Sequence, residues 1–209
     1  MTARYSEFMF GLPWLTEFFH QDAYLVGPTP ADVVTYHLSG LSPEGVMLVR
    51  RDAQRLADGL QAAQIEAIWE SCTETGPYLY PLAQVADGKA WMRQIVQLCD
   101  IRLSAETVQT ELSPTDLLDR PELASEVLTV VREYQSRLGS DVSDALLVAV
   151  ASCTADLAFR FLLRALPQAS RAPHQFTITS TQYTSLKQLA AAFDYGEYAL
   201  SDLDVLIDT

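Results

Sequence analysis

The sequence has few basic residues. Its 209 residues include 14 Lys and Arg against 27 Asp and Glu, which gives a formal net charge of −13 and a pI of about 4.5. Nucleic acids and anionic membranes bind to basic surfaces, so this charge balance argues against both as partners. A basic protein partner fits better, because opposite charges speed the association of two molecules. Many acidic proteins are simply soluble, and composition alone leaves that interpretation open.

Cysteine is scarce, and its spacing argues against a disulfide framework. The three cysteines are far apart, with no C-x-x-C pair: Cys72, Cys99 and Cys153. An odd number of cysteines in apolar surroundings indicates buried free thiols in a reducing compartment. The N-terminal stretch MTARYSEFMFGLPWL has no basic region followed by an apolar run and a cleavage site, so we expect no signal peptide. Together these features predict a cytoplasmic protein.

Long uninterrupted apolar runs are absent as well. The most apolar region, residues 145–166, contains Asp156, Arg160 and Arg164. Charges at these positions argue against a membrane span, which needs about 20 consecutive apolar residues. We therefore predict a buried helix in this region.

The motifs that mark common enzyme classes are also missing. The sequence contains no P-loop, no dinucleotide-binding glycine pattern, no G-x-S-x-G elbow and no H-E-x-x-H pair. A nucleophilic Cys99 would need a nearby histidine and acid, whereas its neighbours Trp91 and Ile95 indicate an apolar helix face. Asp202 and Asp204 have the spacing of a paired acid and base, but solvation or partner binding fits an acidic segment better.

The stretch FFHQDAYLVGPTPADVVTYHLSG contains two of the three histidines. A metal-dependent or hydrolytic enzyme would need His20, Asp22 and His37 to converge. His20 and Asp22 are two residues apart, which places them on different faces of a helix, and metal sites usually bring more ligands. The alternative, which we favour, is that His20 and Asp22 bond to the backbone at a helix end, with no metal and no cofactor. The neighbouring aromatic side chains then pack inward: Phe18, Phe19 and Tyr24.

Prolines and small polar residues divide the chain into helices. Thr29-Pro30, Ser42-Pro43 and Ser113-Pro114 each place a capping side chain before a proline at the first helical position. Between such points the apolar residues follow helical spacing. The expected helices cover residues 5–19, 29–38, 43–60, 64–71, 90–98, 113–118, 119–139, 140–167 and 184–193. Within residues 43–60, the stretch RRDAQR is expected to face solvent.

Two segments fit helices less well. Residues 100–112 have the pattern of a linker or a strand, and HQFTITSTQY at residues 174–183 alternates like a short strand or an extended arm. We predict an all-α multi-helix bundle with at most one short β segment. The linker divides it into two helical halves, residues 1–103 and 104–209, and the second half ends in an acidic tail.

Two short stretches combine tyrosine with carboxylates: GPYLYP beside Glu74, and DYGEYALSDLD near the C-terminus. A tyrosine ring buries area in an interface while the acids attract a Lys- and Arg-rich surface. The alternative is that these tyrosines cover the core and keep their hydroxyls in water. The residues expected to contact a partner are Glu74, Tyr78, Tyr80, Asp194, Glu197, Tyr198, Asp202 and Asp204.

Four stretches follow one another along the first half: FFHQDAYLVGPTPADVVTYHLSG, LSPEGVMLVRRDAQRLADGL, GPYLYP and KAWMRQIVQLC. In this order and spacing, residues 8–99 resemble a family of immunity proteins from bacterial contact-dependent growth inhibition systems. The resemblance implies a small all-α protein, not an enzyme, that binds and neutralises the C-terminal toxin domain delivered by a neighbouring cell. It makes the His20-Gln21-Asp22 triplet a feature of the fold. The resemblance does not extend to residues 104–209.

The expected mechanism is occlusion, in which acidic residues and tyrosines cover a basic active-site cleft, such as that of a nuclease toxin. Two other functions fit parts of the sequence. One is the metal-dependent or hydrolytic enzyme that would use His20, Asp22 and His37. The other is a helical adaptor that offers the stretch HQFTITST for strand addition to a partner.

Overall fold

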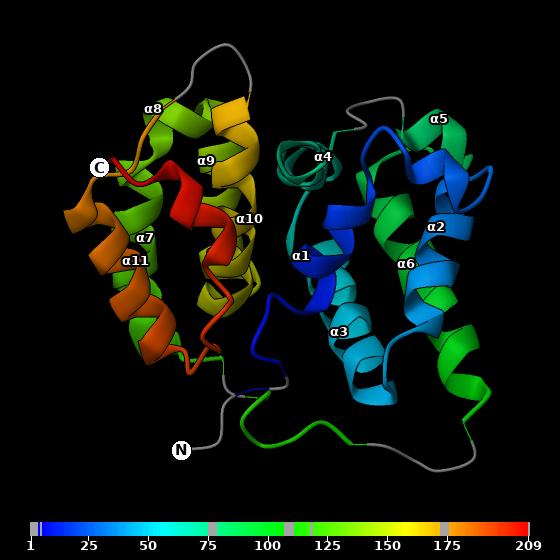
Figure 1. The fold of residues 1–209 in the computed structure, drawn as a ribbon. Helices are drawn as coiled ribbons and strands as arrows, with labels where there is room; N and C mark the ends of the chain where they lie inside the picture. The colour runs from blue at the N-terminus through cyan, green and yellow to red at the C-terminus, as the bar shows by residue number, and fades with distance from the viewer. Residues whose placement is uncertain are drawn as a thin grey trace.

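The computed structural model describes residue 4 and residues 6–74, 79–106, 111–117, 119–171 and 176–208. It confirms the predicted all-α fold. The first helices are α1 (Gly11–Leu15), η1 (Thr16–Phe18), η2 (Ala23–Leu25), α2 (Pro30–Ser39), α3 (Pro43–Gly59), α4 (Ala62–Cys72), α5 (Leu79–Ala83) and α6 (Gly88–Ser104). The later ones are η4 (Pro121–Leu123), α7 (Ala124–Glu133), α8 (Gln135–Leu138), α9 (Ser140–Ser152), α10 (Ala155–Arg171), α11 (Ser180–Ala192) and η5 (Ser201–Leu206). Figure 1 shows the two sets as helical groups side by side.

Two of the predicted helix starts are confirmed in atomic detail. At α2, the Thr29 hydroxyl accepts a hydrogen bond from the Asp32 N–H at 3.2 Å. In return, the Asp32 carboxylate accepts one from the Thr29 N–H at 2.9 Å, which completes a capping box. At α3, the Ser42 hydroxyl accepts from the Gly45 N–H at 3.4 Å. Local chemistry alone therefore fixes where these helices begin.

The third predicted start, at Ser113, is wrong. Residues 114–117 form a turn and not an α-helix. The carbonyl oxygen of Asp116 accepts hydrogen bonds from the guanidinium groups of Arg4 and Arg51. In a continuing helix this oxygen would accept from the N–H four residues later. Tertiary partners therefore compete with the helix at this point.

The apolar region predicted as one helix, residues 140–167, is two helices that fold back beside each other (Figure 1). The chain leaves the helical conformation at Cys153, with φ −116° and ψ −97°. The Thr154 hydroxyl then accepts from the Leu157 N–H at 3.1 Å and caps α10. A capping threonine inside an apolar run is a local start signal, and the prediction missed it.

The first part of the segment predicted as a linker or strand is helical, because α6 continues through residues 100–104. Residues 107–110 lie outside the described part of the chain. The expected helix at residues 119–139 is present with an interruption at Tyr134, which is buried between α7 and α8.

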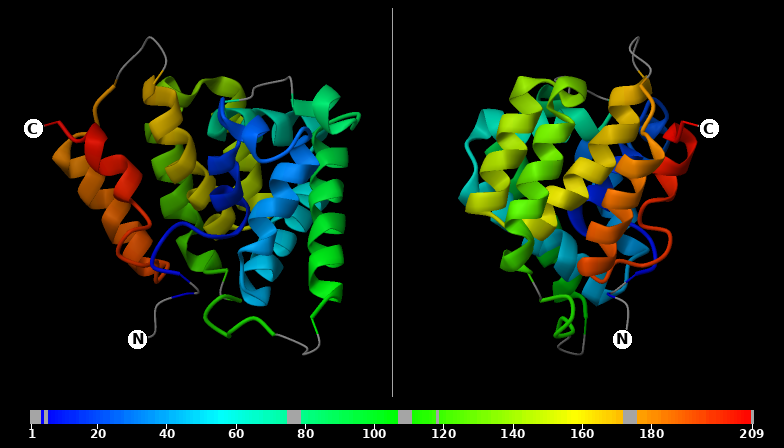
Figure 2. Two further views of the ribbon diagram at one scale, coloured as in Figure 1. Left: turned by 45° about the vertical axis from the view of Figure 1, so that its right-hand side comes forward. Right: turned by 90° about the vertical axis from the view of Figure 1, so that its left-hand side faces the viewer.

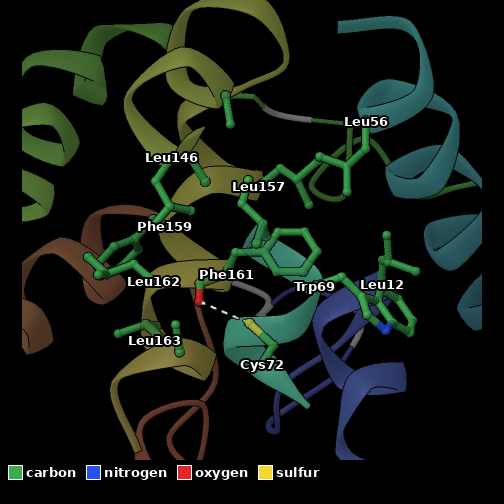
Figure 3. Packing of buried hydrophobic residues seen from close by; sticks show 14 of the residues in the cluster. Leu12, Leu56, Trp69, Cys72, Leu146, Leu157, Phe159, Phe161, Leu162 and Leu163 are labelled. Atoms are coloured by element: carbon green, nitrogen blue, oxygen red, sulfur yellow. Dashed lines mark hydrogen bonds between the residues drawn. The ribbon is translucent and has the colours of Figure 1, made fainter. Parts of the chain in front are cut away.

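A single hydrophobic cluster runs through both helical groups. At its centre, α4 packs against α9 and α10, and Figure 3 shows Trp69 and Cys72 beside Phe161. The Cys72 thiol donates a weak hydrogen bond to the Phe161 carbonyl at 3.7 Å. The two sequence halves therefore share one continuous core.

The C-terminal segment, predicted as an acidic tail, packs on α10. Leu203 and Leu206 of η5 are buried, and the Ile178 N–H donates to the Leu206 carbonyl at 2.7 Å. An isolated parallel bridge joins Ile178 to Ile207. Figure 2 places α11 and this segment on the side that faces away from α1–α6.

The expected exposed arm is therefore contradicted where the structure describes it. Phe176 and Ile178 are buried, and the bridge to Ile207 already uses the strand edge of Ile178. His174 and Gln175 lie outside the described residues. Across the described ranges, no helix combines the length and the apolar character needed to cross a membrane.

Candidate functional site

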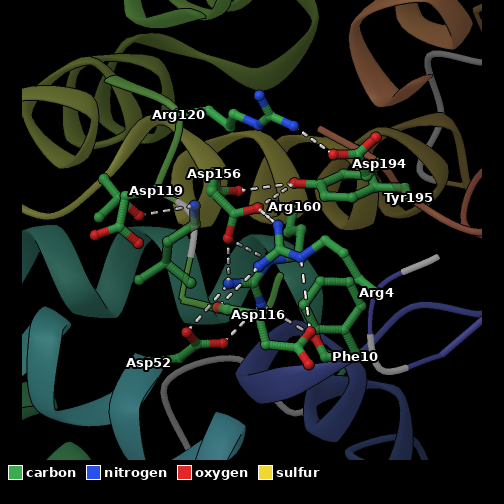
Figure 4. Close-up of polar contacts among 12 residues, drawn as sticks. Arg4, Phe10, Asp52, Asp116, Asp119, Arg120, Asp156, Arg160, Asp194 and Tyr195 are labelled. Atoms are coloured by element: carbon green, nitrogen blue, oxygen red, sulfur yellow. Dashed lines mark hydrogen bonds and ion pairs between the residues drawn. The ribbon is translucent and has the colours of Figure 1, made fainter. Parts of the chain in front are cut away.

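The most tightly built polar cluster is a buried ionic network centred on Arg160 of α10 (Figure 4). The Arg160 side chain is fully buried. It donates to both oxygens of Asp52 on α3, at 2.6 and 3.1 Å, and to Asp156 from two nitrogens, at 3.1 and 2.9 Å. A fifth hydrogen bond reaches the carbonyl of Phe10 at 3.1 Å. All five N–H donors of the guanidinium are thus satisfied.

Asp156 collects further partners from both ends of the chain. The Arg4 guanidinium donates to it, and the Tyr195 hydroxyl donates to Asp156 Oδ1 at 3.0 Å. Burial by itself disfavours the charged carboxylate, but Arg160 and Arg4 outweigh this effect and lower the pKa of Asp156. In the network of Arg4, Asp52, Asp156, Arg160 and Tyr195, the four charged side chains are buried and Tyr195 is half-buried. The network joins the N-terminal segment, α3, α10 and the C-terminal segment.

The sequence carried a signal for this network that the prediction misread. Asp52 belongs to RRDAQR, which was expected to face solvent, yet its side chain is fully buried. Val49, Asp52 and Leu56 lie three and four residues apart, so Asp52 falls on the apolar face of α3. A lone carboxylate on an apolar face, together with charges inside the apolar run of α10, is typical of a buried ion pair.

The accessible candidate site is a groove along α10, between η1 and η5. Three adjoining hollows of about 460, 220 and 190 Å³ share Glu17 and Arg164. Glu74 lines one of them, and Asp202 lines the other two. We call these three hollows the acidic groove.

Arg164 holds two carboxylates in the acidic groove. Its guanidinium donates to Asp202 at 3.1 Å and lies 3.8 Å from Glu17. Burial raises the pKa of the Glu17 carboxyl, Asp202 adds to this effect, and Arg164 opposes it. Arg171 also lines two of the three hollows. The groove therefore has two cations for the three anions Glu17, Glu74 and Asp202, an excess of one negative charge. The Asp202 side chain remains 58% exposed, so this excess is accessible to a partner.

Exposed apolar side chains border the acidic groove. The rings of Phe8 and Tyr198 stack with their centroids 5.1 Å apart, and both line the smallest hollow. Val205, which lines the largest hollow, is 85% exposed. Exposed aromatic rings are enriched in protein interfaces, which makes this surface a candidate for contact with another protein.

The structure brings part of the predicted contact set together. Glu74, Tyr198 and Asp202 line the acidic groove, although residue 74 is far from the other two in sequence. Glu197 is exposed next to Tyr198. Asp204 is exposed and accepts a hydrogen bond from the Tyr183 hydroxyl.

Other members of the predicted set lie elsewhere. Asp194 is half-buried and pairs with Arg120 (Figure 4). Tyr80 is only 8% exposed, so the prediction of an exposed ring at this position is wrong; the α5 helix turns Tyr80 and Leu79 into the core. Tyr78 and the side chain of Tyr24 lie outside the described residues. Sequence could not reveal the contribution of Glu17 and Arg164, because only the fold brings them to the groove.

The predicted hydrogen bond to the turn backbone is present for His20, whereas the Asp22 side chain makes no capping hydrogen bond at η2. The Asp22 N–H donates to His20 Nδ1 at 3.2 Å, which closes the turn. His37 stacks on Phe18 with the ring centroids 3.5 Å apart, and burial, followed by the nearby His20, lowers the pKa of His37. Within the described ranges, no three His, Cys, Asp or Glu side chains are grouped to hold a metal ion.

The cysteines behave as buried thiols. Burial raises the pKa of Cys72 and of Cys99 to about 12, so both stay protonated and unreactive near neutral pH. Cys153 is half-buried and donates to the Arg55 carbonyl at 3.2 Å. All three thiols are free.

Comparison of the chain with protein-family models, curated proteins and solved structures found no match.

Proposed function

We propose that this is an immunity protein, which binds the toxin domain of a contact-dependent growth inhibition system and neutralises it by covering a basic active-site cleft. The observation that carries the proposal is the acidic groove, which joins Glu17, Glu74 and Asp202 with the exposed rings of Phe8 and Tyr198. The resemblance of residues 8–99 to such immunity proteins supports the same function. On this proposal the protein acts by binding and catalyses no reaction.

Charge supports the choice of partner. With a net charge of −13, the protein attracts a cationic surface over several ångströms beyond contact, and this attraction raises the association rate. Aromatic rings then supply the apolar area that holds the complex together. A nuclease needs a basic cleft to bind its own substrate, so covering that cleft both gains charge complementarity and blocks the reaction.

Both halves of the chain contribute to the proposed surface. Glu17 and Glu74 come from the first half, whereas Arg164, Tyr198 and Asp202 come from the second. Residues 104–209 are therefore required to build the groove, even though the family resemblance does not extend to them. A chain limited to residues 1–103 would lack one wall.

Titration calorimetry with the toxin C-terminal domain encoded beside this chain tests the proposal. We expect tight one-to-one binding together with loss of toxin activity. Asp202→Asn should slow association, most strongly at low salt, where charges are least screened. Asp144→Asn changes charge equally at an exposed position of α9 outside the groove and should have little effect. Absence of binding by the wild-type protein would refute the function, and equal effects of the two variants would remove the groove from the interface.

A further inference from the structure

A fourth hollow adjoins the acidic groove, and its walls are mainly apolar. It has a volume of about 270 Å³ and lies between the end of η1, the start of α2 and helix α5. Phe19, Val33, Leu79 and Leu82 supply its apolar walls, and Glu74 lies at its edge. We call it the anchor pocket.

We infer that the anchor pocket receives one aliphatic or aromatic side chain of a basic protein partner, with a neighbouring Lys or Arg of that partner pairing with Glu74. The inference rests on the proposed function and names the contact that would hold the toxin domain. On this inference, the contact in the anchor pocket holds the bound partner in place, and the charge of the acidic groove speeds its association.

The anchor pocket has room for a side chain, with a volume of about 270 Å³. It suits a single large side chain. Tight protein interfaces commonly place one such side chain in a preformed pocket, surrounded by contacts that exclude water.

Exposed apolar side chains surround the anchor pocket. Leu82 on its wall is 58% exposed. Leu25 and Val26 are 72% and 37% exposed, and they lie between Ala23 and Gly27, which both line the pocket. The fold gains nothing from leaving these side chains in water, whereas a partner that covered them would gain their burial.

The acidic surroundings of the anchor pocket favour a basic partner over other occupants. Glu74 lines both the anchor pocket and the nearest hollow of the acidic groove, so the two sites are continuous. Its present partner is Arg171, whose side chain is 61% exposed. An exposed pair of this kind is weak, and a cation from a bound protein can take the place of Arg171. The acidic surface repels an acidic segment or an anionic membrane.

The described walls of the anchor pocket are held in place before any partner binds. The capping box of Thr29 and Asp32 fixes the start of α2. The Glu74 N–H donates to the Phe19 carbonyl at 2.8 Å and ties the end of α4 to the end of η1. A pocket that is already shaped loses little conformational freedom on binding, which favours affinity.

The test compares two exposed residues in binding to the toxin domain, measured by surface plasmon resonance. Leu82→Ser removes an apolar wall of the pocket without adding charge. Ile101→Ser makes the same kind of change on α6, where the side chain is 67% exposed and lines none of the hollows described above. We expect Leu82→Ser to weaken binding about tenfold or more, mainly through faster dissociation, and Ile101→Ser to leave it unchanged. Equal thermal unfolding midpoints would show that both variants are folded.

A second variant, Glu74→Gln, tests the neighbouring cation and should slow association in a salt-dependent way. If wild-type protein binds the toxin domain and Leu82→Ser binds equally well, the anchor pocket is wrong while the immunity function stands. If wild-type protein does not bind at all, the function fails and the pocket inference fails with it. Shifts of the methyl signals of Val33, Leu79 and Leu82 on complex formation would support the pocket directly, and their absence would overturn it.

Discussion

Arg160 and Asp52 are 108 residues apart in sequence and face each other inside the protein, joined by two hydrogen bonds of 2.6 and 3.1 Å. The contact is bidentate, with both side chains fully buried. It links α10 to α3 and thus one helical group to the other. Arg160 also binds Asp156 and Phe10, so one guanidinium connects the N-terminal segment, α3 and α10.

Arg160→Met should lower the free energy of unfolding by about 3 to 5 kcal/mol, because it leaves buried carboxylates without their cation. Arg50→Met provides the control, since Arg50 pairs with Asp100 at the surface and should contribute less than about 1 kcal/mol. Urea unfolding of both variants measures the difference. Similar small losses of unfolding free energy in Arg160→Met and Arg50→Met would show that the buried ionic network is not the main contact that holds the two helical groups together.

Gly11→Ala should destabilise the protein strongly. Gly11 has φ +67°, and an added Cβ would lie 2.1 Å from Asp52 Oδ2 and 2.6 Å from Arg160 Nη1. Gly139→Ala is the matched control, because its φ is +85° but nothing lies within 4 Å of the added Cβ. The control should cost about 1 to 3 kcal/mol for backbone strain alone, because φ +85° and ψ 160° are adopted almost exclusively by glycine. A difference in thermal midpoint between the variants then reports displacement of the buried ionic network.

Glu17→Gln should stabilise the protein at neutral pH. The folded pKa of Glu17 is raised above its ordinary value of 4.5, so the folded state binds the proton more tightly than the unfolded state does. Its contribution to stability is present below pH 4.5 and is lost as the pH rises through the folded pKa. The increase in the free energy of unfolding caused by Glu17→Gln, measured in urea, should therefore appear near pH 7 and become smaller toward pH 4. A gain that is independent of pH would contradict this account.

Leu203→Ala should lower the free energy of unfolding by about 2 to 5 kcal/mol, as expected for a buried leucine. Val205→Ala, two residues further on, should change it by less than about 0.5 kcal/mol, because Val205 is 85% exposed. Chemical denaturation of the two variants distinguishes a C-terminal segment that packs on the protein from a tail that lies in solvent. Equal, negligible effects would indicate the tail that the sequence suggested.

The parts of the fold that depend on neighbouring residues were predictable. The Thr29 and Ser42 caps needed only side chains within three residues, and apolar spacing was enough to define an all-α protein. The turn at Ser113 was not predictable, because guanidinium groups from distant segments bind the Asp116 carbonyl. Local sequence cannot report such a competitor.

In the candidate site, too, some residues were predictable from local sequence and others were not. Tyrosine beside carboxylates was the basis for naming Glu74, Tyr198 and Asp202, and the fold brings these three residues to the acidic groove. The misplacement of Tyr80 arose because a tyrosine in a short helix can face either way, and only packing decides. Arg164 was seen in the sequence only as an interruption of an apolar run. Its role in holding Glu17 and Asp202 follows from tertiary structure alone.

The distance along the chain between Asp52 and Arg160 also determines how long after Asp52 a ribosome synthesises Arg160. A ribosome that adds about 5 to 20 residues per second needs roughly 5 to 20 seconds to make the 108 residues that separate them. During this interval the nascent first helical group contains Asp52 without Arg160, the cation that makes the bidentate contact with it. Tyr195, which completes the hydrogen bonds of Asp156, emerges later still. The buried ionic network can therefore close completely only after Tyr195 has been synthesised.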